Sequence, residues 1–142
     1  MDNLKEINIG AMIQTRWKEL GISLERTCNF FDYSVDEVEQ TFNKTQIETD
    51  LLLKWCKLLE YDFFRLYSHH LILYAPSAPS KYNKNKGTTS LPEFRKSVYT
   101  KEVIDYIMNQ ITNNEKTPGQ VIDEYRIPKT TLYRWMHKYN LK

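Results

Sequence analysis

The chain has 142 residues, of which 41% are hydrophobic and 27% charged, a composition that fits one ordinary globular domain or two small ones. No run of residues approaches the roughly 20 apolar positions that a membrane span requires, and the first residues lack the basic and apolar regions of a signal peptide. These features exclude a membrane protein and predict a cytoplasmic one.

The charge is distributed unevenly along the chain. The formal net charge is only +2, yet residues 1–76 hold eight lysines and arginines against twelve acids, and residues 77–142 hold twelve against six. A surface that binds a polyanion is therefore expected in the C-terminal half.

Helix signals fill the first half of the chain. Apolar residues at helical spacing predict a first helix that Gly21 ends, and Ser23 is the N-cap of a second helix that continues to about Phe31. Ser34 and Glu37 form a capping box that opens a third helix.

Two more helices are predicted before the composition changes at residue 75. Thr49 or Asp50 caps the fourth, and the fifth begins near Asp62. Residues 71–74 are short and apolar enough to form a strand instead. We expect residues 1–74 to form a five-helix domain.

This spacing resembles the repressor-type helix-turn-helix family, which includes Cro and the phage repressors. The resemblance covers roughly residues 7–68 and implies a helix-turn-helix fold in which the third helix reads DNA bases. The residues that carry it are Ile9, Gly10, Ile13, Ser23, Cys28, Ser34 and Val38.

The predicted third helix departs from that family because it is acidic. Asp36, Glu37 and Glu39 would repel a phosphate-lined groove, although the first two also complement the helix dipole. This domain therefore either contacts DNA through its last turn or serves protein contact or dimerisation. The possible secondary DNA contacts in that turn are Gln40, Asn43 and Lys44.

Residues 58–74 carry more aromatic surface than one small helical unit easily buries. Part of that surface belongs to the core, and the surplus predicts self-association into a homodimer.

Adjacent helical residues point about 100° apart, so His69 and His70 cannot coordinate the same metal ion. This pair is expected to face solvent or a partner.

Residues 75–97 concentrate proline, serine, asparagine and lysine without a sustained apolar period, which predicts a flexible linker. Its basic side chains either lie along a phosphate backbone as an arm or belong to a plain soluble spacer. They are Lys81, Lys84 and Lys86.

Residues 98–142 predict a three-helix unit. Thr100 caps its first helix, and Thr117, Pro118 and Gln120 supply an N-cap, a first-turn proline and a capping-box partner for the second. The apolar period then breaks, and a third helix begins at about Lys129.

The outer face of that last helix is cationic and rich in hydroxyl groups, and it contains no acid. Such a helix suits the major groove, where lysine and arginine neutralise phosphates and other polar side chains approach base edges. We expect Lys129, Arg134 and Lys138 to anchor phosphates. The predicted DNA-binding residues are Lys129, Thr130, Thr131, Tyr133, Arg134, His137 and Lys138.

Residues 124–135, EYRIPKTTLYRW, resemble the DNA-binding domain of orfA-type insertion-sequence transposases, whose pattern is roughly E-Y-G-I-S-x-x-T-L-Y-R-W. The resemblance implies a helix-turn-helix unit that binds duplex DNA. Arg126 stands where the family has a turn glycine, and a positive φ there would cost on the order of 1 kcal/mol.

No arrangement of side chains typical of an enzyme is found. The chain has no metal-binding spacing of cysteine and histidine, no glycine-rich phosphate loop, and no arrangement of serine, cysteine and histidine typical of a catalytic nucleophile. We therefore expect no catalysis, metal, cofactor or small-molecule ligand. The sequence predicts an all-α protein of two small helix-turn-helix domains that binds double-stranded DNA. Three roles stay open: a transcriptional regulator, an accessory or relic protein of a mobile element, and an interaction adaptor that has lost DNA binding.

Overall fold

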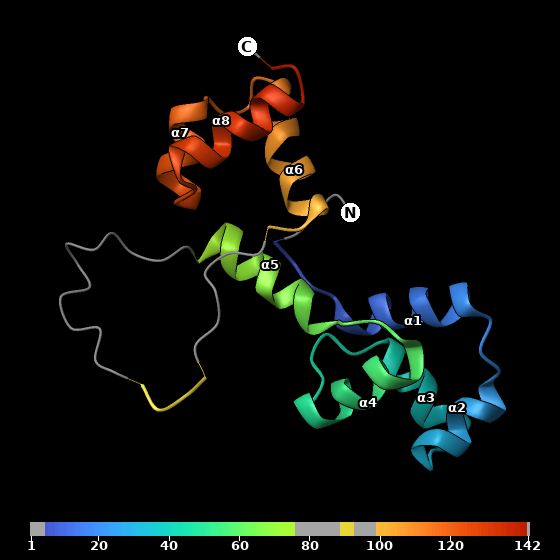
Figure 1. The fold of residues 1–142 in the computed structure, drawn as a ribbon. Helices are drawn as coiled ribbons and strands as arrows, with labels where there is room; N and C mark the ends of the chain where they lie inside the picture. Colours follow the sequence, from blue (N-terminus) through green and yellow to red (C-terminus); the bar gives the residue numbers. More distant parts are fainter. Residues whose placement is uncertain (1–4, 76–88, 93–98, 142) are drawn as a thin grey trace. The chain divides into compact units, whose positions relative to one another are not determined.

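The computed structural model describes residues 5–75, 89–92 and 99–141, and within these ranges the protein consists of eight α-helices without a strand (Figure 1). This confirms the predicted all-α class and shows that residues 71–74 are helical. The helices are α1 (Ile9–Leu20), α2 (Leu24–Phe31), α3 (Val35–Phe42), α4 (Thr49–Leu59), α5 (Phe64–Tyr74), α6 (Lys101–Thr112), α7 (Pro118–Tyr125) and α8 (Lys129–Lys138). Among the described residues, no helix is long and apolar enough to cross a membrane.

Two predicted caps start helices in the first half of the chain. The Ser23 hydroxyl accepts a hydrogen bond from the Arg26 N–H at 3.2 Å and begins α2. Ser34 and Glu37 form the predicted capping box at the start of α3. Because these bonds join residues three positions apart, the local sequence is sufficient to specify them.

The start of α4 differs from the prediction. This helix begins at Thr49, and its N-cap residue is Glu48, whose side chain makes no capping hydrogen bond. The prediction that Thr49 or Asp50 caps α4 is therefore wrong, because both residues lie inside its first turn.

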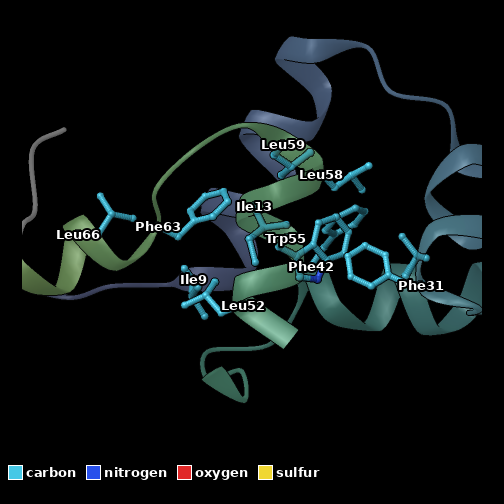
Figure 2. Close-up of a cluster of buried hydrophobic side chains, with 11 residues drawn as sticks. Ile9, Ile13, Phe31, Phe42, Leu52, Trp55, Leu58, Leu59, Phe63 and Leu66 are labelled. Carbon is cyan, nitrogen blue, oxygen red and sulfur yellow. The ribbon is translucent and has the colours of Figure 1, made fainter. Parts of the chain in front are cut away.

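Contacts divide the chain into two compact units, one containing Asp2–Ser68 and the other containing His69–Lys142. In the first unit α1 packs against α3 and α4, and α2 packs against α3. The core is centred on Trp55, which is fully buried between Phe31 and Phe42, with ring centroids 4.3 and 5.9 Å away (Figure 2). Burying an aromatic side chain of this size contributes roughly 3 kcal/mol.

Gly10 allows α1 to lie very close to the end of α3. Its N–H donates to the Lys44 carbonyl at 3.0 Å. A Cβ atom on residue 10 would lie 2.5 to 2.7 Å from the carbonyl oxygens of Thr41, Phe42 and Lys44, so only glycine fits. This contact fixes the segment that follows α3.

The division between the units falls inside α5, six residues before the predicted domain end at residue 74. Leu66 belongs to the core of the first unit. His69 and Tyr74 instead belong to the second unit and bond within it. The Thr100 hydroxyl lies 2.9 Å from the His69 Nε2, and the Tyr74 and Tyr106 hydroxyl groups lie 3.1 Å apart. Most of the predicted linker, residues 76–88 and 93–97, lies outside the described residues.

Thr100 and His69 both differ from their predicted roles. Thr100 is the N-cap residue of α6 by position, but its side chain makes no capping hydrogen bond and pairs with the His69 Nε2 instead. His69 is only 5% exposed, so the expectation that it faces solvent or a partner is wrong. A contact between residues 31 positions apart cannot be read from local sequence.

Candidate nucleic-acid interface

The pair α7 and α8 begins with the capping box predicted from the sequence. The Thr117 hydroxyl accepts from the Gln120 N–H at 3.2 Å, and the Gln120 side-chain oxygen accepts from the Thr117 N–H at 2.9 Å. Pro118 occupies the first helical position. These contacts fix where α7 starts, and so where the turn into α8 falls.

The turn between the two helices contains only residues 126–128. Arg126 ends α7 in the left-handed region with a φ of 56°, which is the conformation that favours glycine. Ile127 is buried beside the helices, and Pro128 precedes α8. The positive φ whose cost was considered for Arg126 is therefore present in the structure.

The inner face of α8 is held by apolar contacts. Leu132, Trp135 and Met136 are buried, and α6 and α7 both pack against α8. The Trp135 ring also meets Tyr99 edge to face, with 4.9 Å between centroids. Tyr139 has the spacing of this apolar face, but it is 39% exposed and its hydroxyl donates to the Asp105 carboxylate.

A polar network joins α6 to α7. The Tyr125 hydroxyl donates to the buried Gln110 side chain at 2.9 Å and accepts from the Lys116 ammonium at 3.1 Å. Lys116 also forms an ion pair with Glu124. Burial alone would lower the pKa of Lys116, but the hydrogen bonds to Glu124 and Tyr125 outweigh it and raise the pKa. One of the two acids of α7 is thus paired with a cation.

A second hydrogen-bonded pair ties the end of α5 to α6. The Tyr74 and Tyr106 hydroxyl groups lie 3.1 Å apart. Burial and this bond raise the pKa of Tyr74 above its ordinary value. Neither this pair nor the network around Tyr125 was singled out by the sequence. Gln110 was the one available signal, since it is a polar residue on the apolar face of α6.

The predicted DNA-binding side chains all lie on α8 away from its packed face. Thr131 is half-buried, and the rest are exposed: Lys129, Thr130, Tyr133, Arg134, His137 and Lys138. The Lys129 ammonium lies 5.6 Å from the centroid of the Tyr133 ring, a cation–π contact that holds the two side chains together. The helix itself contains no acid, so its outer face carries three positive charges without internal compensation.

The predicted secondary contacts lie at the end of α3 in the first unit. Gln40, Asn43 and Lys44 are exposed, and the Asn43 amide donates to the Glu39 carbonyl at 3.3 Å. Asn43 and Lys44 border an open hollow of about 740 Å³ that Tyr33, Ile47 and Leu51 also line.

Acidic side chains surround that second surface. Asp36, Glu37 and Glu39 are all exposed on α3. The Glu37 carboxylate accepts from the Ser34 N–H at 2.7 Å within the capping box, whereas Asp36 and Glu39 have no such role. The surface at the end of α3 is therefore much less favourable to a polyanion than α8.

Lys81, Lys84 and Lys86 lie outside the described residues. In the described ranges no group of three or more histidine, cysteine or acidic side chains is arranged to hold a metal ion.

Comparison of the chain with protein-family models, with curated proteins and with solved structures gave no significant match.

Proposed function

We propose that this protein is a non-catalytic, sequence-specific double-stranded DNA-binding protein that regulates transcription in the cytoplasm, with α8 as its recognition helix. The observation that carries the proposal is the outer face of α8. Six of the seven DNA-binding side chains predicted on α8 are exposed and Thr131 is half-buried, the helix holds no acid, and a turn of three residues joins it to α7. A helix with these properties fits the major groove and gains affinity by displacing counterions from phosphates.

A homodimer is part of the proposal because α5 has exposed apolar side chains. Leu71 is 58% exposed and Tyr67 is 37% exposed. Arg65 is the only charged residue of this helix. Pairing of two chains would bring two recognition helices to one duplex and raise the overall affinity.

Two other roles have specific support. The resemblance of residues 124–135 to the orfA-type pattern favours an accessory protein of a mobile element that binds element ends without catalysis. The acidic surface of α3 favours an adaptor that contacts proteins instead of DNA.

The salt dependence of duplex binding separates DNA binding from the adaptor role. If about five phosphates are contacted, the logarithm of the association constant should fall with the logarithm of the salt concentration at a slope of about −4 to −5. Titration of a fluorescent duplex at several salt concentrations measures that slope. An adaptor would bind no duplex and give no slope.

Selection of bound fragments from genomic DNA with the full chain separates the two DNA-binding roles. Recovery of fragments upstream of genes supports a transcriptional regulator, whereas recovery of the repeated ends of a mobile element supports the accessory role.

A further inference from the structure

The geometry of α8 distinguishes the side chains on its outer face from one another. Successive residues of an α-helix are rotated by about 100°. The buried residues Leu132, Trp135 and Met136 define the direction of the core. The direction opposite to them falls on Thr130, Arg134 and His137, which follow each other at spacings of four and three residues.

The remaining predicted contacts lie on the two sides of that central line. Lys129 and Tyr133 occupy one side, where the cation–π contact joins them. Thr131 and Lys138 occupy the other, and Thr131 is already half-buried. When a helix enters the major groove, the residues on its central line reach the base edges and those on its sides approach the phosphate backbones.

Arg134 is the side chain on the central line that carries a forked pair of donors. Its side chain is exposed, and its guanidinium makes no hydrogen bond or ion pair with any described residue. A guanidinium donates two parallel hydrogen bonds to the N7 and O6 atoms of guanine, and this is the commonest base-specific contact of proteins in the major groove.

The composition of α8 favours guanine over the other bases. The helix contains no asparagine or glutamine, which would read adenine with two bonds, and no carboxylate, which would accept from cytosine. Thr130 has one hydroxyl and cannot form the paired contact.

We propose that Arg134 is a specificity-determining residue that reads guanine in the major groove, instead of the phosphate anchor that the sequence alone predicted. This inference rests on the proposed binding of duplex DNA by α8. The phosphate contacts then come from Lys129 and Lys138.

The first experiment is selection from random duplexes with the full chain and with Arg134→Lys, which keeps the charge but removes the fork. The natural chain should recover a motif with a fixed guanine. Arg134→Lys should bind duplexes with a similar salt slope but show a weaker preference for guanine at that position alone, because a lysine ammonium can still donate to guanine but lacks the planar fork of the guanidinium. The natural preference for guanine there should be roughly 5- to 150-fold, the range for a paired contact.

The second experiment removes one acceptor from the DNA. Replacing the selected guanine by 7-deazaguanine deletes the N7 acceptor and leaves base pairing unchanged. The natural chain should bind the altered duplex about tenfold more weakly, whereas Arg134→Ala should bind both duplexes equally. Lys138→Ala is the matched control: it should weaken binding to both duplexes and keep the tenfold difference between them.

The outcomes separate the inference from the function on which it rests. If Arg134→Ala keeps the penalty for 7-deazaguanine, or if the selected motif has no guanine that depends on Arg134, the inference is wrong and duplex binding stands. If the natural chain binds no duplex at any salt concentration, the proposed function is wrong and the inference falls with it. Arg134 lies outside the core, and circular dichroism of each variant verifies that the fold is retained.

Discussion

The two helix pairs α2–α3 and α7–α8 share a left-handed turn and differ in the charge of the second helix. Each pair contains a capping box, at Ser34 before the second helix α3 and at Thr117 before the first helix α7. In each pair the first helix ends with a non-glycine residue in the left-handed region, at Asp32 and Arg126. The second helix of the first pair exposes acids, whereas the second helix of the other pair exposes cations and hydroxyl groups. A shared turn therefore says little about what a helix pair binds, and the side chains on its outer face decide it.

The pairs also differ in how they are held in their units. The end of α3 lies directly against Gly10 of α1, with no space for a side chain. The α7–α8 pair is held by buried side chains and by the network of Lys116, Gln110 and Tyr125. Close backbone contact should make the first pair the more sensitive of the two to a single added methyl group.

The largest expected effect tests this difference. Gly10→Ala should lower the free energy of unfolding of the first unit by about 3 kcal/mol, because the new Cβ atom meets three carbonyl oxygens that belong to the backbone. Gly119→Ala, in α7, should raise the stability of the second unit by up to about 1 kcal/mol, because a Cβ there meets only the Thr117 hydroxyl at 3.9 Å. Urea titration followed by circular dichroism measures both. Equal changes in the free energy of unfolding for the two substitutions would contradict the difference between the two helix pairs.

The next effect tests the difference in surface charge. Arg134→Ala combined with Lys138→Ala should weaken duplex binding by roughly 2–3 kcal/mol at moderate salt and flatten the salt slope by about one, because Lys138 is the phosphate contact of this pair. The control Lys54→Ala with Lys57→Ala removes the same charge from exposed positions of α4 and should change affinity by less than about 0.5 kcal/mol. Gel shifts at several salt concentrations compare the pairs. Equal losses in both would mean that only the total charge matters.

A smaller effect tests the two capping boxes. Thr117→Ala and Ser34→Ala should each lower the stability of their own unit by about 1 kcal/mol, because each leaves an N–H group at a helix start without its acceptor. Hydrogen exchange at the first turns of α7 and α3 assigns the loss to the correct unit. A loss spread over both units in either variant would show that the units do not unfold separately.

The smallest effect tests the two turns. Arg126→Gly should raise the stability of the second unit by about 0.5–1 kcal/mol, since it relieves a side chain at a φ of 56°. Asp32→Gly should raise the stability of the first unit by less, because aspartate adopts a positive φ more readily than arginine. Thermal unfolding measures the gain in stability of each variant. A larger gain for Asp32→Gly than for Arg126→Gly would contradict this prediction.

The sequence predicted those parts of the fold that short-range bonds determine. The caps at Ser23, Ser34 and Thr117 each involve a residue three positions away, so the local pattern was sufficient. The resemblance to the orfA-type pattern pointed to Arg126 as the turn position, where φ is 56°. The outer face of α8 followed from the helical period of Leu132, Trp135 and Met136.

The parts that the sequence did not predict depend on residues far apart in the chain. Thr100 pairs with His69, and Tyr74 with Tyr106, across more than 30 positions. Tyr139 fits the apolar period of α8, yet it lies at the end of the helix and its hydroxyl bonds to Asp105, which raises the pKa of Tyr139. Such contacts depend on how helices pack, and helical periodicity carries no information about them.

The bonds of His69 and Tyr74 to α6 have a practical consequence for protein engineering. A segment transplanted into another scaffold from residue 98 onward would leave the Thr100 and Tyr106 hydroxyl groups without the partners they have in the natural chain. Anyone who grafts the last three helices should carry the end of α5 with them, supplied in the same chain or as a separate peptide.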